Sequence, residues 1–510
     1  MTADFATAGL DRLQRGHLRH FDNLSRQPQN DWSLMKGRST GQDDFGGFRF
    51  QLAYMMWALA LTHVHRMPAA PGLFKQTFER LFEKLLLPEV WMYWRDVSQG
   101  GTVFNAHLSD QYREEWDPVR RDNIMYSAYV QSCALLYHYL FRDDRYAQPG
   151  SITFRHWSYF WGGEPKIFEY DETSLNEHVY WLMAESGFLG VACEPNCIFQ
   201  ICNQPAILGF RLHDLVHGGS RAAEVVRSYE AAWAEFGRTS DDGHFIVMMA
   251  ADTHAVRPNR LKSPWVDAWT GALMNMWNRE LVRQAYPRQA DDLIEDRLDG
   301  TMTLRIPDRP DVMGQKIVSD DCDFGWAAAW TSELGDDRRL AGLLAHADRY
   351  MCPRWRDGGL HYPRNDKPED RFGNRTLVEP HTGNVLLGYA RLNVPDGLWR
   401  LYNEPLEEQF FRRAALTQVD QGVELHRALH DARGLAFRMA TVGAGEASVT
   451  LGRLPAEGWR LCCDSVQVAS CAAGIIEQTS GEFLAPSPSG DEIVIRCPDT
   501  SVHDYLLEAA

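Results

Sequence analysis

Residues 193–203 read Cys-Glu-Pro-Asn-Cys-Ile-Phe-Gln-Ile-Cys-Asn, which places three thiols within ten residues. An acid, an aromatic ring and two amide side chains are interleaved with them. The segment has too many reactive groups for a simple connection and too few charges for a surface loop. Asn203 is a good helix cap, and Pro205 suits the first turn of a helix over the apolar segment 206–212. We therefore expect Cys202 to lie where the backbone N–H groups of a helix start lower the pKa of a thiol.

Composition restricts the classes of partner. The chain of 510 residues is 45% apolar and contains 17 tryptophans, so it can bury a large core and still line a cavity with aromatic rings. The net charge of −17 argues against nucleic acid or an anionic membrane as a partner. The first residues lack the basic and apolar regions of a signal peptide, and no apolar run is long enough for a membrane span. The ten cysteines are therefore expected to be reduced thiols in a cytoplasmic protein.

Most of the chain has the apolar periodicity of helices joined by alternately short and long loops. Residues 48–61 are apolar on nearly all sides, and Phe50, Tyr54 and Trp57 share one face of that helix. Further helices are expected over 5–21, 74–87, 123–141, 171–185, 203–217, 220–236, 264–277, 324–334, 338–350 and 383–391. Paired helices of this kind close into an (α/α)6 toroid, whereas a stacked solenoid requires a fixed sequence repeat that we do not find.

The character of the sequence changes after about residue 415. Short alternating runs at 435–441, 447–451, 459–463 and 492–496 predict strands separated by Gly, Pro and Ser. We therefore expect a mainly α protein in three parts. Residues 1–45 form an N-terminal helix and loop, 46–415 the barrel, and 416–510 a small antiparallel β domain that caps the barrel or serves in assembly.

The cysteine segment is open to three interpretations. Structural zinc favours two Cys-x2–4-Cys pairs, and no second pair follows. Buried cysteines also serve simply as small apolar side chains. The third interpretation is acid–base chemistry, because two thiols in contrasting environments can supply a proton donor and a proton acceptor in an apolar cavity.

Histidines do not indicate a metal site in the sequence. His213 and His217 are four residues apart on a predicted helix, a spacing that metal sites use. The residue after His213 is aspartate, so the His-Glu-x-x-His zinc motif is not present, and we interpret both histidines as structural. We expect no metal and no cofactor.

Four segments resemble a known family. They are 122–126, Asp-Asn-Ile-Met-Tyr; 193–203, quoted above; 90–94, Val-Trp-Met-Tyr-Trp; and 264–270, Pro-Trp-Val-Asp-Ala-Trp-Thr. In this order they resemble the linalool dehydratase/isomerase family, with the similarity running from about residue 46 to about residue 390. The resemblance implies an (α/α)6 barrel with a hydrophobic pocket and no cofactor. It also implies a ring-shaped homo-oligomer whose pocket lies partly between subunits. The family's known reaction interconverts a monoterpene tertiary alcohol, its primary allylic isomer and a triene by adding or removing water.

The resemblance also implies roles for single residues. The family's two acid/base cysteines match Cys193 and Cys202, its pocket phenylalanine matches Phe199, and its pocket methionine matches Met125. Asp22 is the candidate for the loop aspartate that touches the substrate hydroxyl.

Two positions depart from the family pattern. Tyr129 replaces a pocket histidine and Trp269 replaces a pocket tyrosine. Both changes favour the stabilisation of a carbocation over hydrogen bonding to a substrate hydroxyl. The sequence thus predicts catalytic roles for Cys193, Cys202, Tyr129 and Asp22, and substrate contacts for Met125, Phe199, Trp269, Phe50, Tyr54, Glu194 and Cys197.

The leading hypothesis is a dehydratase/isomerase that acts on a small hydrophobic isoprenoid alcohol. A protonation-initiated terpenoid cyclase on the same scaffold is the first alternative. A carbohydrate-active (α/α)6 enzyme would need two carboxylates facing each other across the pocket. A non-catalytic lipid-binding protein would use the pocket without turnover.

Overall fold

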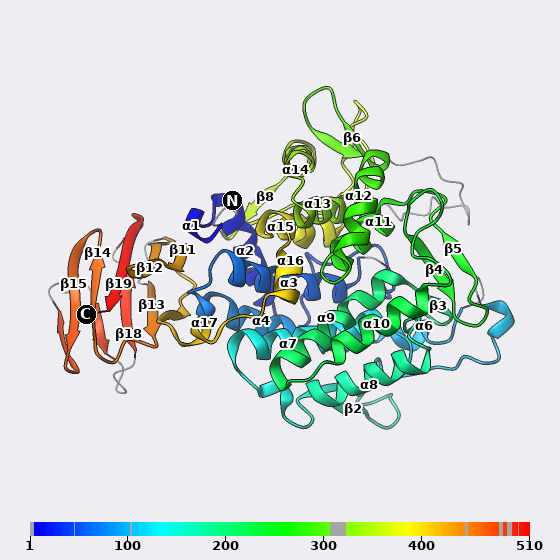
Figure 1. The fold of residues 1–510 in the computed structure, drawn as a ribbon, viewed down its shortest axis with the longest axis horizontal. Coiled ribbons are helices and arrows are strands. Elements are labelled where there is room, and N and C mark those ends of the chain that lie inside the picture. Colours follow the sequence, from blue (N-terminus) through cyan, green and yellow to red (C-terminus); the bar gives the residue numbers. More distant parts are fainter. Residues whose placement is uncertain are drawn as a thin grey trace.

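The computed structural model describes residues 5–44, 46–101, 105–305, 323–443, 447–478, 483–486, 492–497 and 499–509. Within these ranges the protein is mainly helical, with separate small antiparallel sheets (Figure 1). The helical part occupies most of the molecule, and the strands of the C-terminal residues extend from one end of it. None of the helices in these ranges is long and apolar enough to cross a membrane.

Helices of two kinds alternate along the chain. The helices α3 (Phe48–His65), α7 (Ile124–Phe141), α11 (Pro264–Met274) and α13 (Asp323–Leu334) are buried on almost every side. The helices α2 (Arg12–Ser25), α4 (Pro71–Leu85), α10 (Arg221–Trp233) and α14 (Asp337–Tyr350) bury one face only, as their amphipathic sequences predict. A buried helix and an amphipathic helix therefore follow each other repeatedly.

The remaining helices complete this pattern. They are α8 (Glu172–Glu185), α9 (Gln200–His217), α12 (Arg279–Leu293), the π-helix η3 (His381–Leu386) and its continuation α15 (Leu387–Leu392). Short helices are α1 (Phe5–Ala8), α5 (Pro88–Trp91), α6 (Tyr93–Val97), η1 (Ala106–Leu108), η2 (Arg145–Ala147), α16 (Gly397–Asn403) and α17 (Glu408–Arg412). The buried helices α3, α7, α9, α11, α13 and α15 each contact the next in this order, and α15 contacts α3 again.

Small sheets lie in the loops between helices. They comprise β1 (Ile152–His156) with β2 (Lys166–Tyr170), and β3 (Cys197–Ile198) with β4 (Ile246–Ala250) and β5 (Val256–Pro258). Two further pairs are β6 (Ile294–Asp296) with β7 (Met302–Leu304), and β8 (Arg354–Arg356) with β9 (Gly359–His361). The pair β3–β4 aligns Cys197 with Ala250, so the cysteine segment is held by main-chain hydrogen bonds.

The C-terminal residues form two antiparallel sheets, as the alternating sequence runs predict. One sheet has the order β10-β13-β18-β17 and the other β11-β12-β19-β14-β15-β16. The strands are β10 (Ala415–Val419), β11 (Val423–His430), β12 (Gly434–Thr441), β13 (Ala447–Gly452), β14 (Gly458–Cys463), β15 (Val466–Ala472), β16 (Ile475–Gln478), β17 (Phe483–Pro486), β18 (Ile493–Cys497) and β19 (His503–Ala509). The division into domains at residues 45 and 415 stays a prediction.

One close contact joins η3 to the end of β9. The backbone N–H of Tyr362 donates to the carbonyl of Gly383 at 3.0 Å. A Cβ atom on Gly383 would lie 1.9 Å from the carbonyl oxygen of Tyr362, a distance at which the backbone itself must move.

Replacing Gly383 by alanine should therefore lower the free energy of unfolding by about 2–4 kcal/mol, because backbone cannot yield as a flexible side chain can. The measurement is denaturant unfolding of Gly383→Ala and of the control Gly163→Ala, where a Cβ meets nothing within 4 Å. Equal stability of the two variants would contradict the steric explanation.

Candidate active site

A cavity of about 880 Å³ opens beside the cysteine segment. Its lining comes from the loop before α3, the N-terminal ends of α3, α7 and α9, the β4–β5 hairpin and α11. The lining residues are Asp43, Asp44, Arg49, Phe50, Asn105, His107, Met125, Cys193, Glu194, Asn196, Cys197, Phe199, Ile201, Cys202, Val247, Met248, Ala250, Asp252, Thr253, Arg257, Trp265 and Trp269. The three clustered thiols therefore meet at one cavity.

The cysteine segment is a tight turn leading into α9. The N–H of Cys193 donates to the carbonyl of Cys197 at 2.9 Å, and the N–H of Cys197 donates to the carbonyl of Glu194 at 2.8 Å. Asn196 adopts a positive φ of 66°, which asparagine tolerates better than most residues. The turn thus directs Cys193, Glu194 and Cys197 toward the same space.

The helix after this turn begins earlier than the sequence predicted. Helix α9 starts at Gln200, so Asn203 lies inside it instead of capping it, and Pro205 falls beyond the first turn. The buried side chain of Asn203 accepts the N–H of Val191 at 2.9 Å and donates to the carbonyl of Val191 at 3.1 Å. Asn203 therefore clamps the segment that precedes the turn, and Cys202 lies in the first turn of α9.

The two outer thiols are buried and hydrogen-bonded to each other. This hydrogen bond lowers the pKa of Cys193, but burial and the neighbouring Glu194 leave that pKa raised overall. Burial first, and then the hydrogen bond with Cys193, raise the pKa of Cys202 well above its ordinary value. The expectation that the helix start would lower the pKa of Cys202 is therefore wrong, because loss of hydration outweighs the helix terminus.

Glu194 and Arg49 complete the electrostatics around the thiols. Burial raises the pKa of Glu194, while the Arg49 guanidinium and a hydrogen bond from the Cys193 thiol act in the opposite direction. Arg49 is itself buried, with its guanidinium 4.2 Å from the centre of the Phe50 ring and 4.0 Å from that of Tyr93. A cation thus lies near the carboxylate that accepts a hydrogen bond from the Cys193 thiol.

Aromatic rings form part of the cavity wall. Phe50 and Trp269 both line the cavity, with ring centres 5.6 Å apart in an edge-to-face arrangement. Tyr54 and Tyr129 do not belong to the lining but pack behind it, with the Tyr129 hydroxyl 3.3 Å and the Trp269 Nε1 2.8 Å from the Tyr54 hydroxyl. The predicted aromatic wall is therefore two layers deep.

A sequence model of the family described as linalool dehydratase/isomerase matches residues 49–368, more than half of the chain. This chain belongs to the linalool dehydratase/isomerase family. The resemblance carried by the four quoted segments is thereby confirmed.

Solved structures were also compared. An inactive variant of the α-1,6-mannanase GH76A of Salegentibacter sp. HEL1_6, in complex with α-1,6-mannotriose, is 12% identical with a TM-score of 0.41, over 74% of this chain and 99% of that one. The Lin0763 protein from Listeria innocua is 10% identical with a TM-score of 0.39, over 74% and 96% of the two chains. A GH76 α-mannanase of Bacteroides thetaiotaomicron is 9% identical with a TM-score of 0.38, over 70% and 88%.

For this member of the linalool dehydratase/isomerase family, the structure brings most predicted site residues to one place. Met125, Phe199, Glu194 and Cys197 line the cavity together with the outer cysteines, Phe50 and Trp269. Burial raises the pKa of Cys197 to about 12, so this third thiol stays protonated as part of the wall.

Asp22 does not lie at this cavity. It lines a separate pocket, where its carboxylate accepts hydrogen bonds from Arg80 Nη2 at 2.6 Å and from the Thr77 hydroxyl at 2.8 Å, and pairs with Arg26 at 2.8 Å. These partners fix Asp22 on α2 away from the thiols of its own chain, and its match to the family's loop aspartate stays a prediction.

The sequence reasoning missed acids and polar side chains at the cavity. Asp43 and Asp44 reach it from the loop before α3, and the carboxylate of Asp252 pairs with His107 at 2.9 Å. The Asp-, Gln- and Gly-rich composition of residues 23–44 gave the only sequence signal for the first two. Pairing of residues as distant as His107 and Asp252 has no signature in a single sequence.

His381 is a second missed residue. It lies behind the cavity wall on η3, its ring centre 5.8 Å from that of Phe50 and 5.6 Å from that of Tyr54. Burial lowers its pKa to about 3, so the imidazole is neutral and adds to the aromatic layer.

The raised thiol pKa values predict slow alkylation. Cys193 and Cys202 should react with iodoacetamide more slowly than the exposed Cys352, and their rates should rise about tenfold for each pH unit below their pKa values. Peptide mass spectrometry measures the three rates. A pH-independent rate at Cys202 in the neutral range would show that a thiolate is already present there.

Proposed function

We propose that the protein is a cofactor-independent dehydratase/isomerase that acts on an allylic or tertiary isoprenoid alcohol through cysteine acid–base chemistry. The observation that supports it is the hydrogen-bonded pair Cys193 and Cys202 at the wall of a cavity that also presents Phe50 and Trp269. Membership of the linalool dehydratase/isomerase family supports the same reaction class.

We further infer an (α/α)6 barrel. The order in which buried helices contact one another, ending with α15 against α3, supports a closed inner ring with the amphipathic helices outside it. The cavity then lies at the mouth where α3, α7 and α9 begin, and the long loops gather there. The homo-oligomer implied by the family and the cytoplasmic location stay predictions.

The two thiols differ enough to take opposite roles. The shared hydrogen bond makes Cys193 the easier thiol to ionise and Cys202 the harder, so Cys202 is the acid and Cys193 the base. Glu194 accepts a hydrogen bond from the Cys193 thiol, and burial raises the pKa of this carboxyl group. Transfer of the Cys193 proton to Glu194 therefore produces a thiolate without placing a second negative charge in the cavity.

After one turnover of the proposed reaction, Cys193 and Cys202 return to their starting protonation states. Cys202 donates its proton to the substrate hydroxyl and the C–O bond breaks. Water departs, and the substrate becomes an allylic cation. The Cys193 thiolate then takes a proton from the carbon next to the cation, which forms the new C=C bond. Return of that proton from Cys193 to the Cys202 thiolate, along the hydrogen bond that joins them, restores the starting state.

The cation formed in this way is stabilised by the π-electrons of surrounding aromatic rings. The faces of Phe50, Phe199 and Trp269 supply them, with about 0.5–2 kcal/mol for each cation–π contact. Tyr129, expected to be catalytic, instead supports the wall from behind. A volume of about 880 Å³ also accommodates substrates larger than a monoterpene, so cyclisation of a longer isoprenoid is a second outcome of the same chemistry.

Removing either outer thiol should abolish turnover. Cys193→Ala and Cys202→Ala should each lower the rate by about 10²–10⁴, the usual contribution of a positioned acid or base. Gas chromatography after incubation with linalool, geraniol and their C15 and C20 analogues measures acyclic trienes, isomeric alcohols and cyclic products. Cys352→Ser is the matched control at an exposed cysteine. Full activity of both alanine variants would exclude the thiol mechanism, and ligand binding without any turnover would favour a lipid-binding protein.

The Glu194 relay predicts a pH effect. Below the raised pKa of Glu194 the pair Cys193–Glu194 holds both protons, so activity should fall as the pH drops through that pKa. Glu194→Gln should lower kcat and shift the rising limb of the pH–rate profile to higher pH, because the thiol must then ionise without a carboxylate acceptor. A profile that is unchanged in Glu194→Gln would contradict the relay.

Carbohydrate chemistry remains the competing function, and the acids at the cavity favour it. Asp43, Asp44 and Asp252 line the cavity together with Glu194. Hydrolysis of a glycosidic bond by two of them would survive Cys193→Ala and Cys202→Ala but not Asp44→Asn. Release of reducing sugar from α-1,6-linked mannooligosaccharides is the measurement that separates the two functions.

A further inference from the structure

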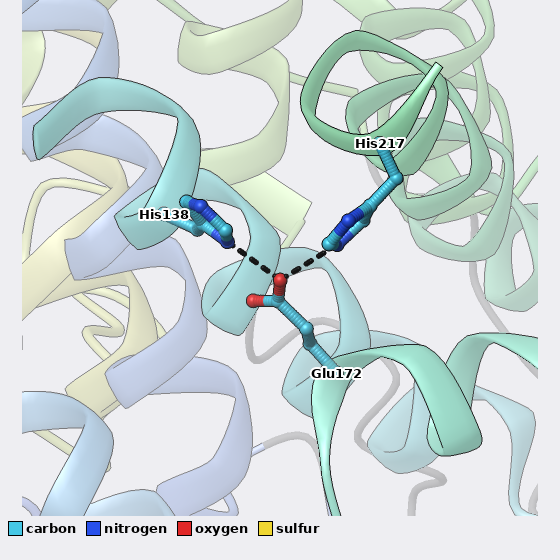
Figure 2. Close-up of side chains that lie close together, drawn as sticks. All are labelled: His138, Glu172 and His217. Carbon is cyan, nitrogen blue, oxygen red and sulfur yellow. Dashed lines mark hydrogen bonds and ion pairs between the residues drawn. The ribbon is translucent and has the colours of Figure 1, made fainter. Parts of the chain in front are cut away.

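A cluster of imidazoles around one buried carboxylate lies outside the site described above. Glu172 is the first residue of α8, His138 lies near the end of α7, and His217 is the last residue of α9. Figure 2 shows both imidazoles pointing at the same oxygen of Glu172. The distances from that oxygen are 2.6 Å to His138 Nδ1 and 2.8 Å to His217 Nε2.

The carboxylate of Glu172 is buried, and one of its two oxygens has no hydrogen-bond partner. The side chain of Glu172 is fully buried, and its ion-pair partners among the described residues are the two imidazoles. The second oxygen, Oε2, is also buried and has no hydrogen-bond partner. A buried carboxylate without a permanent cation, and with one oxygen unused, is costly unless a positive charge binds it.

A further imidazole lies beside the cluster. The ring centre of His213 is 4.7 Å from that of His217, one helical turn away on α9. Its Nε2 is buried and has no hydrogen-bond partner.

We propose that His138, Glu172 and His217 bind a divalent metal ion of the zinc type. Their donor atoms lie within 4.8 Å of one another, and imidazole with carboxylate is a ligand set that suits Zn²⁺. Entry of the ion widens the present hydrogen-bond distances to about 3.3 Å, the separation of ligand atoms at bonds of about 2.0–2.1 Å.

The site would join three helices. The side chains of His138 and His217 are 17% and 30% exposed, so an ion can enter from solvent. Once bound, it fixes the end of α7, the start of α8 and the end of α9 to one another. Such a clamp contributes directly to the stability of the folded chain.

Metal titration of the full chain tests this proposal. After chelator treatment, calorimetric titration with Zn²⁺ near neutral pH should give a single site per chain, and the thermal unfolding midpoint should rise with Zn²⁺. His217→Ala, which changes a partly exposed side chain, and Glu172→Gln should each weaken binding by at least about tenfold, because altering even supporting partners of a ligand costs that much. Both variants should also lose the zinc-dependent rise of the midpoint.

Two controls separate this site from other donors. His254→Asn replaces an exposed histidine and should bind as the unaltered chain does. His503→Asn removes the histidine of the group Cys463, Asp464 and His503, which also has metal-ligand spacing. Co²⁺ in place of Zn²⁺ should show no charge-transfer band from thiolate. Binding that persists in His217→Ala and Glu172→Gln, or that is lost only in His503→Asn, would overturn the proposal.

Discussion

The close approach of α7 and α9 is the contact on which the site depends. Gly209 of α9 faces Gln131 of α7, and a Cβ at position 209 would lie 2.4 Å from the side-chain amide of Gln131. That amide also donates to Asn176 of α8 at 2.7 Å, so the three helices are tied together at their middle. A larger residue at position 209 would separate the helices and thereby displace whatever is attached to their ends. Since the cysteine segment is attached to the start of both helices, its position follows from this packing.

The start of α7 holds the cysteine segment directly. The N–H of Asn123 donates to the carbonyl of Cys193 at 3.1 Å, and the N–H of Ile124 donates to that of Ala192 at 3.2 Å. Groups that a helix start normally offers to water or to a cap therefore bind the segment that carries the thiol. This attachment buries Cys193 and Cys202, and burial decides their protonation against the influence of the α9 terminus. The packing of α7 against the cysteine segment thus sets the pKa of these thiols, because a buried thiolate loses its hydration.

The sequence predicted the elements whose pattern is local. Helix α3 is apolar on nearly all sides and was expected within a few residues of its bounds, and so was α7. Helix α12 was missed because it is polar and contains Pro287. The boundary of α9 was misplaced because Asn203 has the residue type of a cap but makes its hydrogen bonds from inside the helix. The residue type alone does not distinguish an asparagine that caps a helix from one that lies inside it and binds a neighbouring segment.

The site residues also divide into those that one short segment predicts and those that only the tertiary fold brings together. Cys193 and Cys202 could be chosen from one short segment, because their spacing and the resemblance agree. Asp43 and Asp44 could not, since their approach to the thiols depends on how the loop before α3 folds back, and Arg49 could not, since it reaches them from the start of another helix. The histidines show the same limit: His213 and His217 lack the glutamate of a zinc motif because the glutamate comes from α8. A ligand supplied by a neighbouring helix leaves no spacing to find.

The two ends of α7 and α9 have opposite requirements, and the helices keep them apart. Cys202 and His217 are fifteen residues apart on α9, about 22 Å at about 1.5 Å per residue. Thiolates bind zinc more strongly than imidazoles do, so thiols close to the histidine cluster would compete for an ion there. Buried thiols with raised pKa values at the far end of the same helices neither compete for the ion nor lose their protons to it. One helix pair can therefore carry the proposed acid–base site at one end and the proposed metal site at the other, because distance and burial separate their chemistry.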